Sequence, residues 1–98
     1  MSIPVISAFI FDDENLDKFW ARGFTDIQIA SVLENRPYVG RNRNNRRGTH
    51  IVIGVDDSGN YISIPVEPTY DEYLWRPVTA WLSKKSERTA RERTLGNK

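Results

Sequence analysis

The chain has 98 residues, of which 39% are hydrophobic and 28% charged, and its formal net charge is +1. This length suits one domain with one core, and the composition excludes a fully disordered chain. The absence of cysteine excludes disulfides and thiolate metal sites, and the single histidine argues against a histidine-based metal site. The longest apolar stretch, residues 3–11, is too short for a membrane span and lacks signal-peptide features. We therefore expect a cytoplasmic protein without a cofactor.

The charges are distributed unevenly along the chain. Residues 41–50 contain four arginines and no acidic residue, whereas residues 51–75 contain five acidic residues and no basic one. Residues 76–98 contain seven basic and two acidic residues. Two basic segments separated by an acidic one could form a common basic face after folding, and such a face favours RNA as the target.

The first half of the chain predicts a strand and two helices. Residues 3–11 are rich in β-branched and aromatic side chains, which indicates a strand. Asp12 or Asp13 fits the N-cap of a helix that ends at Gly23. The apolar stripe expected for this helix consists of Leu16, Phe19 and Trp20.

A second helix is expected directly afterwards. Thr25 and Gln28 have the spacing of a capping box, and Arg36 precedes Pro37, so the helix should end by Asn35. We expect its buried face to comprise Ile27, Ala30 and Leu33, flanked by Ile29 and Val32.

The middle of the chain predicts a β-hairpin. Residues 41–48 contain no apolar side chain and are expected to form a mobile basic loop. Alternating apolar residues predict strands over 50–55 and 61–66, joined by a turn at 56–60. Pro65 cannot donate a backbone hydrogen bond, so it should lie at a sheet edge or a bulge.

The end of the chain predicts one more strand, over residues 74–81, and a polar helix or tail over residues 84–98 with Ser83 as its N-cap. In that strand Arg76, Val78 and Ala80 should share one face, and Trp75, Thr79 and Trp81 the other. The expected fold is therefore a single α+β domain, residues 1–98. Two N-terminal helices and a C-terminal helix pack on a small antiparallel sheet.

Several segments in this order resemble the BrnT-type toxins, RelE-like ribonucleases of bacterial type II toxin–antitoxin pairs. The matching segments are Phe11-Asp12-Asp13, Arg22-Gly23, Ile53-Gly54, Arg76-Pro77-Val78-Thr79-Ala80 and Glu87-Arg88. The resemblance covers nearly the whole chain, and its C-terminal run is the most specific part. It implies a RelE-like fold and metal-independent RNA cleavage in which the ribose 2′-hydroxyl attacks the adjacent phosphate. It also implies a cognate antitoxin protein as partner; a homodimer is left open.

The resemblance suggests roles for particular residues. Arg76, together with Arg46 or Arg47, would clamp the phosphate, because a guanidinium binds phosphate through two hydrogen bonds. His50 would serve as base or acid, with a pKa suited to proton transfer near neutral pH. Glu87 is a weaker alternative base. Arg88 would be a supporting cation. Four further basic residues would contact RNA: Arg41, Arg43, Lys84 and Lys85.

Each feature also has a structural interpretation. The arginine loop could be solvated without a specific role, and His50 could be a surface or edge residue. Arg76 could pair with the acidic segment 67–73, and Glu87 could form an i,i+4 pair with Arg91. Aromatic side chains could stack on RNA bases or serve the core or a partner interface: Trp75, Trp81, Tyr61, Tyr70 and Tyr73. A non-catalytic nucleic-acid-binding or protein-interaction module is therefore the alternative to a ribonuclease.

Overall fold

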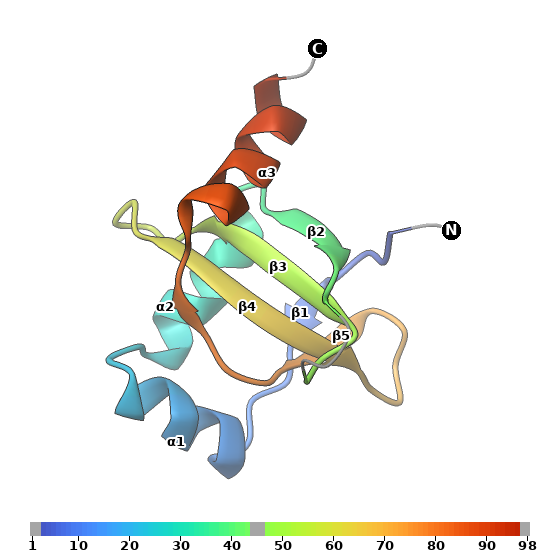
Figure 1. The fold of residues 1–98 in the computed structure, drawn as a ribbon. Coiled ribbons are helices and arrows are strands. Elements are labelled where there is room, and N and C mark those ends of the chain that lie inside the picture. Colours follow the sequence, from blue (N-terminus) through green and yellow to red (C-terminus); the bar gives the residue numbers. More distant parts are fainter. Residues whose placement is uncertain (1–2, 44–46, 97–98) are drawn as a thin grey trace.

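A mixed β-sheet forms the centre of the fold, with helices on both of its sides (Figure 1). The computed structural model describes residues 3–43 and 47–96. Its strands are β1 (Ala8–Phe9), β2 (Tyr38–Arg41), β3 (His50–Val55), β4 (Tyr61–Pro68), β5 (Leu74–Pro77) and β6 (Trp81–Leu82). They follow the order β1-β5-β4-β3-β2, and β6 pairs with β4 beyond the end of β5. The expected α+β class is confirmed.

Two expectations about the strands are wrong. The sheet is not wholly antiparallel, because β1 runs parallel to β5. The strand expected over residues 3–11 is only Ala8–Phe9, since few of its backbone groups find a neighbour at this sheet edge. Strand β2 was not expected at all: Pro37 ends the preceding helical segment, and β2 then pairs with β3. Because Arg41 belongs to β2 and pairs with His50, the loop expected over residues 41–48 begins one residue later than predicted.

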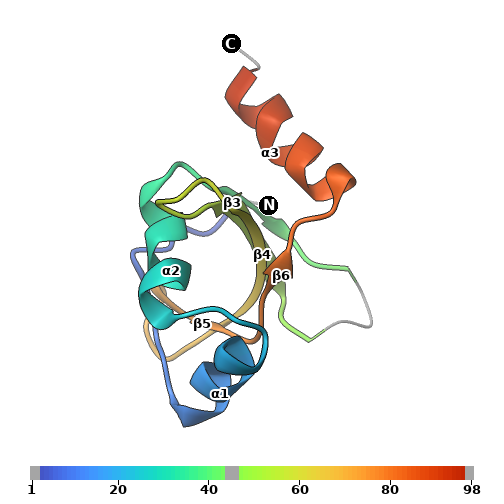
Figure 2. The same cartoon turned by 90° about the vertical axis from the view of Figure 1, so that its left-hand side faces the viewer.

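The helices divide between the two faces of the sheet. α1 (Asp13–Ala21), α2 (Asp26–Ser31) and the 3₁₀ turn η1 (Val32–Glu34) cover one face, here called the core face. α3 (Lys85–Gly96) lies on the opposite side, near one end of the sheet (Figure 2). We call this second side the outer face.

The predicted start and end of α1 are confirmed. The side chain of Asp12 accepts from the backbone N–H of Asn15, and the side chain of Asn15 accepts from that of Asp12, which completes a capping box. Gly23, at φ 83°, follows the helix in the left-handed conformation that favours glycine. Phe19 is fully buried, whereas Trp20, expected on the same stripe, is 69% exposed.

The capping box of α2 is also confirmed, but its buried face is not the expected one. Ile29 and Val32 are fully buried, and Ile27 is 77% exposed. The short helix is oriented by contacts at its ends, where Gln28 Nε2 donates to Asp56 Oδ2 at 2.8 Å. Val32 lies so close to Gly54 that an added Cβ would be 3.0 Å from Val32 Cγ1. Glycine at position 54 therefore permits the helical segment to approach β3.

The core lies between the helix pair and the core face of the sheet. Alternation along β3 and β4 places Val52, Ile64 and Val66 on this face, and all three are fully buried. The other members of the buried cluster are Phe9, Phe19, Phe24, Ile29, Val32, Ile62, Trp75 and Ala80. Burying apolar side chains stabilises the fold by roughly 1.5–3 kcal/mol for each large one.

The strand expected over residues 74–81 is interrupted. Pro77 pairs with Val66, whereas Trp81 pairs with Ser63, so the chain gains one residue between β5 and β6 relative to β4. One extra residue reverses the face to which later side chains belong. Trp75 is therefore in the core and Trp81 on the outer face. The prediction that these two tryptophans share one face of a continuous strand is wrong.

Pro65 lies opposite this interruption. Its carbonyl oxygen accepts from the backbone N–H of Val78 at 2.9 Å, so it points toward the interrupted strand. The nitrogen of Pro65 points the same way, and β3 therefore loses no hydrogen bond to it. The prediction that Pro65 lies at an edge or bulge is confirmed.

The C-terminal helix begins one residue later than expected and has no buried residue. Ser83 is bonded to Ser63 instead, with 2.7 Å between the two hydroxyl oxygens. Within residues 3–43 and 47–96, no helix is long and apolar enough to cross a membrane.

Candidate functional site

Arg76 is held by three carboxylates at one corner of the outer face. Its Nε donates to Asp12 Oδ2 at 2.6 Å, its Nη2 to Glu14 Oε1 at 2.7 Å, and its Nη1 to Glu67 Oε2 at 3.0 Å. Asp12 and Glu14 come from the start of α1, and Glu67 is the cross-strand partner of Arg76. The structure therefore joins α1 to β4 and β5 through one guanidinium.

These contacts shift the pKa values of both partners. The hydrogen bond from Arg76 is the main cause that lowers the pKa of Asp12, and the N–H of Asn15 adds to it. The hydrogen bond to Asp12 likewise raises the pKa of Arg76 above its ordinary value, against the effect of burial, and Glu67 contributes in the same direction. Both groups are therefore charged at neutral pH. The pairing of Arg76 with segment 67–73 that the sequence suggested is present through Glu67.

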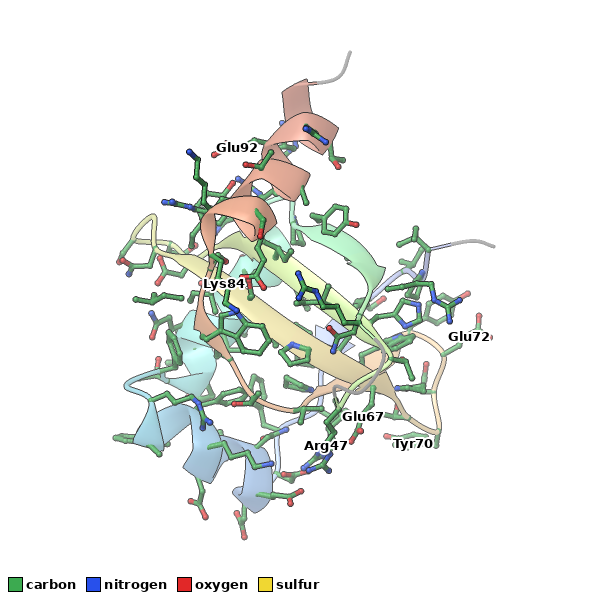
Figure 3. The ribbon with its side chains drawn as sticks, viewed as in Figure 1. Arg47, Glu67, Tyr70, Glu72, Lys84 and Glu92 are labelled. Carbon is green, nitrogen blue, oxygen red and sulfur yellow. The ribbon has the colours of Figure 1, made fainter. Side chains whose placement is uncertain are left out.

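Arg47 reaches the same corner from the arginine-rich loop. Its Nη2 lies 3.8 Å from Glu14 Oε1 and 3.9 Å from Glu67 Oε2, the two oxygens that Arg76 contacts. Figure 3 shows Arg47 and Glu67 side by side at this edge of the sheet. The structure thus brings together two arginines expected to form a phosphate clamp. We call this cluster the arginine corner: Asp12, Glu14, Arg47, Glu67 and Arg76.

Beside the arginine corner lies an apolar pocket of about 340 Å³. We call it the indole pocket, and it is lined by Arg47, Pro65, Val78, Thr79, Trp81 and Lys84. Arg47 belongs to both the corner and the pocket, so the two features are continuous. Thr79 Oγ1 is buried and has no hydrogen-bond partner among the described residues.

A second pocket, of about 230 Å³, lies between the β2–β3 hairpin and the start of α3. Its lining residues are Tyr38, Arg41, Asn42, Arg43, Ile51, Ile53, Ser86, Glu87 and Ala90. Ile51 of this pocket is the cross-strand partner of Pro65 in the indole pocket, so the pockets lie side by side on the outer face. Three of the four expected RNA contacts therefore line this surface, namely Arg41, Arg43 and Lys84, together with Arg47 of the expected clamp.

Glu87 connects α3 to the sheet between these pockets. Its carboxylate accepts from the Ser63 hydroxyl at 2.9 Å, from Trp81 Nε1 at 3.0 Å and from the Lys84 backbone N–H at 2.7 Å. Burial alone would raise the pKa of Glu87, but these hydrogen bonds together lower it below its ordinary value. The carboxylate is ionised and fully engaged, which suits an anchor better than a base.

Arg91 does not form the i,i+4 pair with Glu87 that the spacing suggested. It donates instead to the carbonyl oxygens of Asn35 and Arg36 and to the Tyr61 hydroxyl, and its guanidinium lies 5.4 Å from the centre of the Tyr61 ring. Two anchors, Glu87 and Arg91, therefore hold a helix that buries none of its residues.

His50 lies away from the arginine corner. It pairs with Val66 on the core face, whereas Arg76 pairs with Glu67 on the outer face. The imidazole packs edge-on against Trp75, with 5.1 Å between ring centres. Burial, with a contribution from Arg41, lowers the pKa of His50, so the ring is neutral at neutral pH. The structure does not bring His50 together with Arg76.

The remaining candidates are dispersed. Arg88 and Lys85 are exposed on α3. Arg46 lies outside the described residues, as does part of the loop expected to be mobile. Tyr70 is 89% exposed, on the connection between β4 and β5. Its loop neighbour Tyr73 is 49% exposed.

Sequence reasoning did not assign the carboxylates of Asp12 and Glu14 to Arg76. The signal for them was present: acidic residues in the first helical turn follow the expected first strand. What the sequence lacks is the parallel pairing of β1 with β5, which brings the start of α1 beside Arg76. The hydroxyl of Thr79 was missed because its burial depends on the interruption between β5 and β6.

Among the residues that the structure describes, no group of three or more His, Cys, Asp or Glu could hold a metal ion. Comparison of the chain with known protein families, curated protein sequences and solved structures found no match.

Proposed function

We propose that this domain binds single-stranded RNA along its outer face and cleaves it at the arginine corner, as a ribonuclease toxin of a bacterial toxin–antitoxin pair would. The supporting observation is that Arg47 and Arg76 approach the same two carboxylate oxygens, next to two pockets lined by further basic residues. A RelE-like fold, a cytoplasmic location and a cognate antitoxin belong to the same proposal, through the resemblance to the BrnT-type toxins.

The chemistry follows from the groups in the corner. A carboxylate, Glu67 or Glu14, takes the proton of the ribose 2′-hydroxyl, and O2′ then bonds to phosphorus. The bond from phosphorus to O5′ breaks, which leaves a 2′,3′-cyclic phosphate, and the leaving oxygen takes a proton from water. The guanidiniums of Arg47 and Arg76 stabilise the extra charge on the phosphate in the transition state.

Arg47 is the more available of the two cations. Its side chain is 52% exposed, and both of its carboxylate contacts are longer than 3.5 Å, so a phosphate can replace them at little cost. Arg76 is only 16% exposed and already donates to three carboxylates. In this proposal Arg76 holds the carboxylates in place and contacts the phosphate through the Nη atom nearest Glu67.

A second candidate is a non-catalytic RNA-binding module of the same fold. The saturation of Arg76 by carboxylates favours it, as does the position of His50 on the other face of the sheet. This module would keep the basic surface and the two pockets but would not transfer protons.

A cleavage assay separates the two candidates. Labelled single-stranded RNA is incubated with the protein and a chelator, with and without ribosomes, and products are analysed for cyclic phosphate ends. We expect cleavage by the parent, none of a 2′-O-methyl analogue, and a loss of about 10²-fold or more in Glu67→Gln or Glu14→Gln. Arg76→Lys should cleave RNA far more slowly than the parent, because an ammonium lacks the two-pronged geometry of guanidinium.

The outcome also has a cellular readout. Induction of the parent in bacteria should arrest growth, and the Glu67→Gln or Glu14→Gln variant with the cleavage defect should not. If the parent binds RNA but neither cleaves it nor arrests growth, the enzyme proposal is wrong and the binding module is the better description. If it does not bind RNA in a mobility shift at low salt, both are wrong.

A further inference from the structure

The indole pocket has the composition of a site for a flat aromatic ligand. Its walls are largely apolar, and its lining residues include Trp81, Pro65 and Val78. A volume of about 340 Å³ lies at the small end of the range for ligand pockets, of about 300–1,000 Å³. The pocket therefore suits one small ring system and the group attached to it.

Trp81 is held in a fixed orientation at this pocket. Its Nε1 donates to Glu87 Oε1 at 3.0 Å and to Oε2 at 3.3 Å, and Glu87 is itself held by Ser63 and the backbone of Lys84. The indole edge is thus engaged, whereas the side chain remains half-buried and lines the pocket. An orientation set by a hydrogen-bonded network is what a stacking platform requires, because little side-chain entropy is lost on binding.

Trp75 shows what a structural tryptophan looks like in the same chain. It is 7% exposed, belongs to the core cluster, and donates its Nε1 to the Glu72 carbonyl oxygen at 3.1 Å. Trp81 differs because the extra residue between β5 and β6 turns it to the outer face. A tryptophan is placed there beside a pocket and not within the core.

Two further features of the pocket are polar. Arg47 and Lys84 place positive charge at it, from the arginine-rich loop and from the start of α3. The hydroxyl oxygen of Thr79 is buried without a hydrogen-bond partner among residues 3–43 and 47–96. An unsatisfied buried hydroxyl is destabilising, and a ligand atom that bonds to it would remove this destabilisation.

We propose that the indole pocket binds one unpaired base of RNA, stacked on Trp81, with Thr79 bonded to the base edge and Arg47 or Lys84 to its phosphate. The base must be unpaired, since its face and its edge are inaccessible in a duplex. This inference rests on the proposed function for the identity of the ligand. Because Arg47 also belongs to the arginine corner, a base in the pocket places its neighbouring phosphate at the corner.

The first test measures affinity for a 2′-O-methyl oligonucleotide, which cannot be cleaved through its 2′-oxygen. Trp81→Leu should weaken binding about 5- to 150-fold, the range expected for one lost base–aromatic stack. Trp81→Phe keeps an aromatic face and should lose much less. Trp20→Leu is the matched control, because Trp20 is 69% exposed on α1 on the other side of the sheet, and it should bind like the parent.

The second test does not require binding of a long RNA. The three tryptophans give three indole N–H signals in a proton–nitrogen spectrum, and Trp81→Phe identifies the signal of Trp81. Added 5′-nucleoside monophosphates should shift that signal saturably and leave the signal of Trp20 unmoved. Inorganic phosphate alone should shift it much less. Thr79→Val, which removes only the hydroxyl, should fold at least as stably as the parent and bind the nucleotides several-fold more weakly.

The outcomes distinguish the pocket from the proposed function. If Trp81→Leu and Thr79→Val fold and bind the oligonucleotide like the parent, while loss of the loop arginines weakens binding, RNA binding stands and the base site is wrong. If the parent binds no oligonucleotide but the monophosphates shift the Trp81 signal, the pocket stands as a nucleotide site and the RNA function is wrong. If neither ligand binds, both are wrong.

Discussion

The two faces of the sheet use neighbouring residues of one strand for opposite purposes. In β4, Ile64 and Val66 are fully buried against the helix pair, whereas Ser63 and Glu67 on the other face enter hydrogen-bond networks. On the core side, Asn15 is fully buried, and its amide donates to two backbone carbonyl oxygens. A domain of this size needs one apolar face for its core. The outer face can therefore carry charged and polar groups that are not part of the apolar core.

The difference between the two faces indicates that a functional site should be sought on the outer face. Arg76 and Glu87 are each bonded to at least three groups, and ordering such charged groups gains little net stability, because desolvation offsets the attraction. Two pockets and the basic residues of the loop lie on this same face. Substitutions on the core face should thus have the largest effect on stability, and those on the outer face should have a smaller effect on stability and should also change binding or helix position.

The largest effect on stability is expected from the core. Phe19→Ala removes a fully buried ring and should lower the free energy of unfolding by about 3–5 kcal/mol. Because small domains are stable by only about 5–15 kcal/mol, the variant should melt at a much lower temperature. Urea unfolding followed by circular dichroism measures the change. A loss below about 1 kcal/mol would contradict the assignment of this face as the core.

Arg76→Ala should have the next largest effect. It leaves Asp12, Glu14 and Glu67 close together without their common cation. We expect a loss of about 2 kcal/mol, less than the 3–5 kcal/mol of a fully buried pair, because Asp12 and Glu14 are partly exposed to water. Addition of Glu14→Gln to this variant should recover part of the loss by relieving repulsion. No recovery would show that the carboxylates are not coupled through Arg76.

Glu87→Ala tests whether α3 is held by its anchors. It removes the acceptor of three hydrogen bonds and should cost about 1–2 kcal/mol. The helix itself should fray, because none of its residues is buried, and the helical signal in circular dichroism should fall while the sheet persists. Glu92→Ala, on the exposed side of α3, is the control and should change neither quantity. Equal helicity in the Glu87 variant would show that α3 does not depend on this anchor.

Asp12→Asn should change the dependence of stability on pH. The pKa of Asp12 is lower in the folded state than its ordinary value of 3.8, so its ionised form contributes stability at higher pH. That contribution is fully present above pH 3.8 and is lost as the pH falls through the lower folded pKa. Asn keeps the N-cap acceptor but not the charge. The free energy of unfolding of the variant should therefore fall less than that of the parent between pH 5 and about pH 2. Parallel curves for the two proteins would contradict this coupling.

The smallest effect on stability, and the largest on RNA binding, is expected from the loop. Replacement of Arg43, Arg46 and Arg47 by alanine should change the unfolding free energy by less than about 0.5 kcal/mol. The slope of log affinity against log salt for single-stranded RNA should flatten by about two, since each phosphate contact contributes about 0.7. Arg22→Ala is the control, because Arg22 is an exposed basic residue at the end of α1. An unchanged slope in the triple variant would exclude an electrostatic role for the loop.

Much of the fold follows from local sequence signals. Thr25 with Gln28, Asp12 before a helical stripe, and Gly23 after it define helix ends, because caps satisfy backbone groups within a few residues. Alternation over residues 50–55 and 61–66 predicts a hairpin for the same local reason. The candidate site follows less well. Arg47 and Arg76 were expected to act together and do approach the same carboxylate oxygens, but Glu14, one of the two carboxylates between them, was not assigned to Arg76.

What the sequence by itself determined is most of the elements and the basic character of the loop, and it led to the proposal that Arg47 and Arg76 act together. The tertiary structure alone decided which groups meet. The parallel pairing of β1 with β5 places the start of α1 at Arg76, and no local pattern encodes that contact. One added residue between β5 and β6 turns Trp81 outward and leaves Trp75 in the core. Side-chain direction alternates along a strand, so a single-residue shift that only strand pairing reveals changes which face carries the chemistry.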